Sequence, residues 1–296
     1  MMSGLYSYYL LLRPVAWICF LLPFAVGLGI GAGEKTELFK VFLATISFAS
    51  WMSFSFVVNA IYDKEVDKYH DGRTKDVDLS KQPLVTGEIS VKKAQIISFL
   101  SLLVSIFSAY LINQNFLIAM ILASFIGLIY SAPPRLKSKP IADVVCNAAA
   151  ASLIFYAGMS VSEYYASIEL YLAAFILAAT FYIPTAVSDF EFDKLVGLKT
   201  TPVFFGPEKT LKSLYIFAVF TVLLWIHVFI SSEKLLIKIL SPLITVYTIF
   251  YVSVVNRRWN GRFLRVSPNL ILAPFALISI ILYLYIFVII FLKVGG

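Results

Sequence analysis

The sequence predicts an all-α integral membrane protein with nine transmembrane helices, built as one polytopic domain over residues 1–296. The chain is 60% hydrophobic and only 14% charged, a composition that soluble domains of this size do not have. Its apolar residues are collected in charge-poor runs of about 20 residues, the length that an α-helix needs to cross a bilayer. The net charge of +7 does not indicate a nucleic-acid partner, because the basic residues lie in short loops between these runs.

The charge-poor runs place each helix in order. The first run has full span length and lacks a signal-peptidase motif, so we expect a membrane helix and no cleavable signal peptide. An uncharged stretch of 41 residues, 94–134, is divided at Asn113-Gln114-Asn115, a polar segment that suits a tight turn between two helices. The predicted helices cover residues 14–33, 39–62, 94–112, 116–132, 142–161, 168–188, 211–231, 235–255 and 268–292.

The basic residues predict the orientation of the chain in the cell membrane. Nineteen of the 24 lysines and arginines lie on one side, near the N-terminus and in loops 63–93, 135–143, 189–212 and 256–267. Positively charged loops stay on the cytoplasmic side, so we expect the N-terminus and these loops in the cytoplasm and the C-terminus outside. Eight spans would break this asymmetry.

Two aspartate pairs, each spaced by four residues, follow apolar runs on the same side. The first pair is Asp63 and Asp67, with Asn59 one helical turn earlier, and the second is Asp189 and Asp193. Residues four apart on a helix point the same way, so each pair presents two carboxylates to one place. Carboxylates are costly beside membrane spans, and Mg²⁺ is commonly held by one or two carboxylates plus substrate phosphates. A single pair would indicate solvated loop charges, but two matching pairs favour a site for two Mg²⁺ ions and a polyphosphate.

Basic residues on this side are expected to meet the remaining phosphate charge. Arg135 and Lys137 are the strongest candidates, because two prolines precede them and restrict the loop. The other candidates for diphosphate contact are Arg73, Lys81, Tyr130 and Lys194, together with Asn59.

The cysteines and histidines add no site at this stage. Cys19 and Cys146 lie in apolar runs, and we expect them to pack without forming a disulfide or binding a metal. His70 lies in the charged loop after the first acidic pair, where we expect it to be solvated, with a phosphate contact as the alternative. His227 stands alone in a predicted helix and is interpreted as a hydrogen-bonding residue between helices.

The sequence also contains a faint internal repeat. Pro83-Leu84-Val85-Thr86-Gly87-Glu88 follows the first acidic pair, and Pro202-Val203-Phe204-Phe205-Gly206-Pro207-Glu208 follows the second. Both segments lie between an acidic pair and a new apolar helix. We therefore predict that helices 2–3 and 6–7 are copies of one unit, with their acidic ends facing each other.

Taken together, these motifs resemble the UbiA superfamily of intramembrane prenyltransferases over most of the chain. The matching segments are RPVAW at 13–17, Asn59-x3-Asp63-x3-Asp67, PLVTG at 83–87, YSAPPRLK at 130–137, and Asp189-x3-Asp193 followed by Lys194, Gly197 and Thr200. The resemblance implies a central cavity capped by the cytoplasmic loops. It also implies that Asn59 and the four aspartates bind the metal and diphosphate, supported by Arg73, Arg135 and Lys137.

Two positions depart from the pattern of that family. Ala60 follows Asn59, where many members have Asp. Gln82 stands before Pro83-Leu84 in place of the usual Arg, which leaves Lys81 as the substitute basic residue.

The predicted function is Mg²⁺-dependent transfer of a prenyl group from an isoprenyl diphosphate, such as geranylgeranyl diphosphate, to a lipophilic acceptor. Neutralising the diphosphate makes it a better leaving group. The 26 Phe and 17 Tyr are ample for an aromatic wall that stabilises an allylic cation, although we expect most of them to face lipid or to pack between helices. The acceptor stays open between a quinone precursor, a glycerol-phosphate ether lipid and a carotenoid-like lipid. The alternative is a transporter that uses the paired aspartates for cation coupling; their place at the cytoplasmic rim beside basic loops favours the enzyme.

Overall fold

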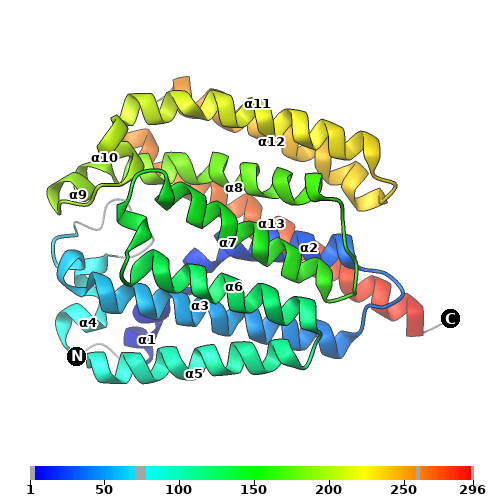
Figure 1. Cartoon of the computed structure of the whole chain (residues 1–296), viewed down its shortest axis with the longest axis horizontal. Coiled ribbons are helices and arrows are strands. Elements are labelled where there is room, and N and C mark those ends of the chain that lie inside the picture. The colour runs from blue at the N-terminus through cyan, green and yellow to red at the C-terminus, as the bar shows by residue number, and fades with distance from the viewer. Residues whose placement is uncertain (1–3, 71–77, 258–260, 295–296) are drawn as a thin grey trace.

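The computed structural model describes residues 4–70, 78–257 and 261–294, of which 256–272 and 294 are described by their backbone only. This part of the chain is helical and contains no strand. Its long helices run side by side with roughly parallel axes (Figure 1). Nine helical segments within the described ranges are long and apolar enough to cross a membrane, which confirms the predicted fold class.

The nine segments match the predicted spans closely. The first consists of α1 (Gly4–Leu12), a 3₁₀ turn (Pro14–Trp17) and α2 (Ile18–Gly31). The others are α3 (Leu38–Asp67), α5 (Val91–Tyr110), α6 (Gln114–Ser131), α7 (Ala142–Ser160), α8 (Ile168–Ser188), α11 (Pro207–Ser231), α12 (Leu235–Arg257) and α13 (Gly261–Val294).

The first span is the one that differs most from the prediction. It begins at Gly4, ten residues earlier than expected, and is broken at Arg13, whose φ of 49° and ψ of 55° are left-handed. Pro14 follows directly, and proline disfavours the α conformation at the residue before it. The break therefore has a local cause in the Arg13-Pro14 sequence.

The connections at one end of the bundle contain three short helices: α4 (Pro83–Thr86), α9 (Phe190–Leu195) and α10 (Thr201–Phe205). Figure 1 shows them at the same end as the N-terminus, while the C-terminus lies at the opposite end. Both α4 and α10 have proline in the first turn and are followed by a glycine with positive φ, 81° at Gly87 and 87° at Gly206. The internal duplication remains a prediction.

Small residues allow a close contact between α2 and α7. A Cβ atom added to Gly27 would lie 2.1 Å from the carbonyl oxygen of Phe155, and one added to Gly158 would lie 2.4 Å from that of Phe24. Close backbone approach through small residues is typical of helix pairs in membranes. Both helices also line the cavity described below.

Candidate active site

The first acidic pair lies at the end of α3. This helix continues through Asp63 to Asp67, beyond the boundary at residue 62 that apolarity predicted. Both carboxylates are buried, with Asp63 7% and Asp67 4% exposed. The helical spacing of four places them on one face, directed into the bundle. A buried carboxylate requires a partner or a cation, so this pair is not a solvated loop pair.

Asp63 has two cationic partners from the loop between α6 and α7. The Arg135 guanidinium donates to Oδ1 at 2.6 Å, and the Lys137 ammonium donates to Oδ2. The side chains of Asp63 and Lys137 are each 10% exposed, so this ion pair is shielded from water. Two of the predicted phosphate-binding residues are therefore brought directly to a predicted metal ligand.

The second acidic pair lies where α8 meets α9. Asp189 is the junction residue between the two helices, and Asp193 lies within α9, where its N–H donates to the Asp189 carbonyl at 2.8 Å. Each side chain belongs to a buried residue, 8% exposed. Thr200, one residue before α10, donates its hydroxyl to Oδ2 of Asp193 at 3.0 Å.

A cavity of about 940 Å³ joins the two acidic pairs to the interior of the bundle. Its polar end is lined by the four aspartates, Asn59, Tyr130 and Lys137. Its remainder is lined by apolar and aromatic side chains from α2, α3, α7, α8, α12 and α13. A charged mouth that leads into a long apolar interior suits a ligand with an anionic head and a hydrocarbon tail.

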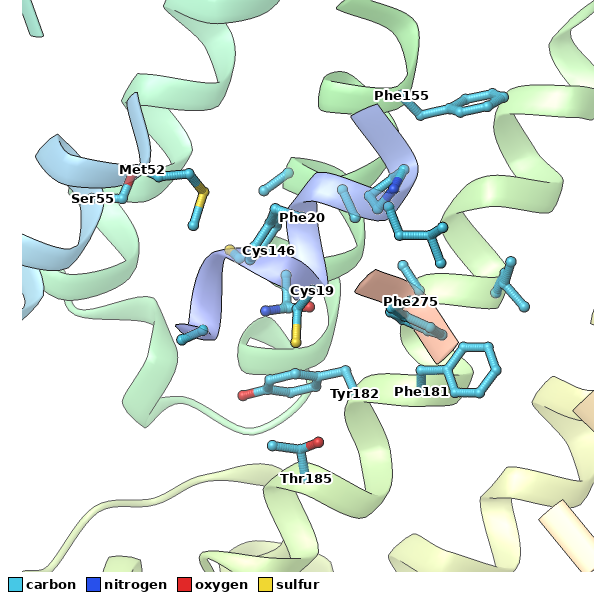
Figure 2. A pocket seen from close by; sticks show the side chains of 18 of the residues that line it. Cys19, Phe20, Met52, Ser55, Cys146, Phe155, Phe181, Tyr182, Thr185 and Phe275 are labelled. Carbon is cyan, nitrogen blue, oxygen red and sulfur yellow. The ribbon is translucent and has the colours of Figure 1, made fainter. Parts of the chain in front are cut away.

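Aromatic rings surround the cavity just beyond its polar end. The Tyr130 and Tyr182 hydroxyls are hydrogen-bonded at 3.1 Å. The Phe181 and Phe275 rings meet edge to face, with centroids 5.5 Å apart. Figure 2 shows Tyr182, Phe181 and Phe275 around the space that Cys19 of α2 also faces. Such rings offer π faces that could stabilise a cation within the cavity.

Lys81 and Lys194, two other predicted basic residues, do not line this cavity. Lys81 is 70% exposed at its side chain and pairs with Asp78 at 3.3 Å. A hydrogen bond from Ser80 lowers the pKa of the Asp78 carboxyl, and Lys81 lowers it further. The Lys194 ammonium lies 5.7 Å from the ring centroid of Phe190 at an exposed position. Arg73 lies outside the described residues.

The structure corrects the expectation for His70. This residue is only 4% exposed, and its ring meets that of Phe192 edge to face at 5.0 Å. His70 follows the first acidic pair and Phe192 lies within the second, so the contact joins the ends of α3 and α9. The sequence predicted a solvated residue because the surrounding loop is highly charged.

The cavity lining also includes Arg13, Tyr182 and Thr200, none of which was among the predicted site residues. The Arg13 guanidinium lies 5.3 Å from the ring centroid of Phe56. Its signal in the sequence is the Arg13-Pro14 pair. The helix breaks at this pair, and Arg13 adopts a left-handed backbone conformation. Tyr182 had no signal, because one tyrosine in an aromatic-rich helix looks like the others.

The carboxylates of the two acidic pairs are a donor set that suits Mg²⁺. Within the described residues, no three His, Cys, Asp or Glu side chains are grouped closely enough to hold a single ion. Each acidic pair therefore offers at most two carboxylates to an ion. Mg²⁺ is commonly bound in this way, with waters and substrate phosphates completing its octahedral shell.

Comparison with protein families and curated proteins gives consistent matches. The model of the UbiA prenyltransferase family matches residues 20–267. Digeranylgeranylglyceryl phosphate synthase of Methanosphaera stadtmanae is 26% identical over 205 residues, covering 68% of this chain and 71% of that protein. 2-acylphloroglucinol 4-prenyltransferase of Humulus lupulus is 26% identical over 238 residues, covering 72% of this chain. The match spans only 53% of that plant protein, about half its length.

Solved structures are more similar still. A UbiA homologue from Archaeoglobus fulgidus bound to DMAPP and Mg²⁺ has a TM-score of 0.93 at 56% identity, covering 96% of this chain and 99% of that one. A structure of a UbiA homologue from the same organism bound to GPP and Mg²⁺ has a TM-score of 0.92 at 55% identity. These neighbours hold a short prenyl diphosphate together with the metal that the two acidic pairs here would suit.

Proposed function

Because this chain belongs to the UbiA prenyltransferase family, we propose that it transfers a prenyl group from an isoprenyl diphosphate to a lipophilic acceptor within the membrane, with Mg²⁺ as cofactor. One observation carries the proposal: two buried acidic pairs lie at the mouth of an apolar cavity of about 940 Å³. The Mg²⁺-containing prenyl diphosphate complexes of the Archaeoglobus fulgidus homologue support the same assignment.

The acidic pairs hold the metal in this proposal. Asp63 and Asp67, with the Asn59 amide oxygen, are assigned to one Mg²⁺, and Asp189 and Asp193 to a second. When bound, Mg²⁺ neutralises the diphosphate charge and so makes it a better leaving group. The side chains of Arg135 and Lys137, already within the site, would turn from Asp63 to the phosphate oxygens as that carboxylate engages a cation.

The reaction breaks the bond between the first prenyl carbon and the diphosphate oxygen. A nucleophilic atom of the acceptor forms a new bond to that carbon and loses its proton, and diphosphate departs. Positive charge that develops on the allylic carbon meets the ring faces of Tyr182, Phe181 and Phe275. The apolar lining excludes water, which would otherwise capture the cation and waste the donor.

We propose geranylgeranyl diphosphate as the donor and a glycerol-phosphate ether lipid as the first acceptor to test. Several curated relatives are digeranylgeranylglyceryl phosphate synthases, including that of Thermococcus sibiricus at 28% identity over 72% of this chain and 73% of that protein. A quinone precursor and a carotenoid-like lipid remain in the panel, because the plant relative in the comparison prenylates an acylphloroglucinol.

We further propose that the chain resides in the cell membrane with the site facing the cytoplasm. The acidic pairs, α4, α9 and α10 lie at one end of the bundle, and the connections there carry most of the lysines and arginines. Labelling of engineered cysteines in intact cells with a membrane-impermeant reagent tests this orientation.

Diphosphate release by purified protein tests the activity, with geranylgeranyl diphosphate, the acceptor panel, and Mg²⁺ present or replaced by EDTA. We expect Asp63→Ala and Asp189→Ala each to abolish Mg²⁺-dependent release. Glu65→Ala and Glu191→Ala are matched controls, because both glutamates are exposed and lie between the paired aspartates. Normal turnover by a folded aspartate variant would refute the two-metal assignment. Absence of release with every acceptor, together with cation-coupled uptake in vesicles, would favour a transporter.

A further inference from the structure

A fifth aspartate, Asp143, is buried outside the cavity lining, at the start of α7. It is 0% exposed, yet its carboxylate has donors on both oxygens. Oδ1 accepts from the N–H of Val144 at 2.9 Å and from the Thr201 hydroxyl, and Oδ2 accepts from the N–H of Thr201 at 2.9 Å. A buried carboxylate is tolerated only when it is hydrogen-bonded, so loss of any of these contacts would be costly to the fold.

The Thr201 hydroxyl makes two hydrogen bonds between the start of α10 and the start of α7. It donates to Asp143 and accepts from the N–H of Ile141 at 2.7 Å. Ile141 has a φ of 70°, a conformation that a β-branched residue rarely adopts. Such a conformation persists only where surrounding contacts hold the backbone in place. Here the hydrogen bond from the Ile141 N–H to the Thr201 hydroxyl is such a contact. The start of α7 and the start of α10 are therefore joined as one unit.

This unit reaches both acidic pairs. Thr200, adjacent to Thr201, donates to Oδ2 of Asp193 at 3.0 Å. On the other side, the segment that leads into Asp143 carries Arg135 and Lys137, both bonded to Asp63. The segment of nine residues 135–143 therefore contacts the first acidic pair directly, through Arg135 and Lys137. It reaches the second acidic pair indirectly, because Asp143 bonds to Thr201 and the adjacent Thr200 bonds to Asp193.

We propose that Asp143 is a positioning residue, which holds Thr200 and Thr201 so that Asp193 presents its carboxylate at the correct distance from the first acidic pair. The inference rests on the proposed function, since it assumes that Asp193 binds metal. Partners that orient a metal ligand contribute to metal affinity although they never touch the ion. Asp143 accepts the first N–H of α10 from a different helix, so its effect passes to the site through Thr201 and the adjacent Thr200.

Matched substitutions separate this role from general stability. Thr201→Val keeps the shape of the side chain but removes the hydroxyl, whereas Thr201→Ser retains it. Asp143→Asn keeps the shape but places an NH₂ group against a backbone N–H, because both carboxylate oxygens accept backbone donors. Thr180→Val is the control: Thr180 is a buried residue whose hydroxyl bonds to that of Thr221 at 3.0 Å, away from the cavity lining.

The readout is Mn²⁺ binding in the presence of inorganic pyrophosphate, measured by the electron paramagnetic resonance signal of unbound Mn²⁺, with melting temperatures recorded in parallel. We expect Thr201→Val and Asp143→Asn to weaken Mn²⁺ binding by about 10- to 100-fold, and Thr201→Ser and Thr180→Val to bind like the unsubstituted protein. Steady-state kinetics should then show a rise in the Mg²⁺ concentration needed for half-maximal rate.

Either of two results would overturn the inference: unchanged Mn²⁺ binding in Thr201→Val and Asp143→Asn, or an equal loss in Thr180→Val. If the unsubstituted protein itself binds no Mn²⁺ with pyrophosphate, the proposed function fails. That outcome is distinct, because it appears before any substitution is compared.

Discussion

The contact between α2 and α7 allows a quantitative prediction for Gly27→Ala. The new Cβ would lie 2.1 Å from the Phe155 carbonyl oxygen, whereas ordinary contact begins at 3.4 Å, so the two helices would have to separate by about 1.3 Å. The obstacle is backbone and cannot rotate away. Overpacking of this kind costs about 1–3 kcal/mol, with backbone displacement toward the upper end. Alanine recovers about 1 kcal/mol through its better helix propensity. We expect a net loss of about 2 kcal/mol in the free energy of unfolding.

Gly29→Ala is the matched control in the same helix. Its Cβ would meet only the side-chain tips of Leu236 and Leu282, at 3.0 and 3.1 Å, and flexible tips can move aside. Unfolding of both variants in mixed detergent micelles, followed by tryptophan fluorescence, gives the comparison. We expect Gly29→Ala to stay within about 1 kcal/mol of the original chain. Equal stability of the two variants would refute the argument that backbone contact sets the α2–α7 distance.

Two further predictions concern the cavity. Lys137→Met removes a shielded charged donor and should lower kcat/KM for the diphosphate about 10- to 100-fold. Lys139→Met, at an exposed position of the same loop, should have little effect. Equal effects of the two substitutions would contradict a specific role for Lys137. Ala174 lines the cavity 15 residues before Asp189, about 22 Å along α8. Ala174→Phe should therefore reduce kcat/KM for a C20 donor roughly tenfold or more relative to a C5 donor, and an unchanged ratio would show that the tail does not extend there.

The membrane spans were predictable because their signal is additive over many residues. Every predicted span corresponds to a helix of the structure, since an uncharged run of about 20 residues has few other stable conformations in a bilayer. The ends of α3 and α13 were less predictable. Charged residues continue the helix beyond the apolar run in both cases, and hydropathy carries no information about such extensions.

The site was predictable where helical periodicity applies and not where loops decide. Spacing by four correctly placed Asp63 and Asp67 on one face of α3. Lys81 lies in a 3₁₀ turn and His70 follows the end of α3, so the directions of their side chains could not be derived from α-helical spacing, and the solvation expected for His70 was wrong. Asp143 looked like an ordinary acidic residue in the first turn of a helix. Its role depends on Thr201, 58 residues away, a contact that only the folded structure reveals.

The two acidic pairs differ in how the fold holds them. Asp63 and Asp67 belong to a single unbroken helix of 30 residues, so the helix itself fixes their spacing. Asp189 and Asp193 straddle a joint between α8 and the six-residue α9. The second pair therefore depends on contacts with neighbouring segments, of which the hydrogen bond from Thr200 to Asp193 is one. A substitution in those segments would change the geometry of the second pair without altering either aspartate.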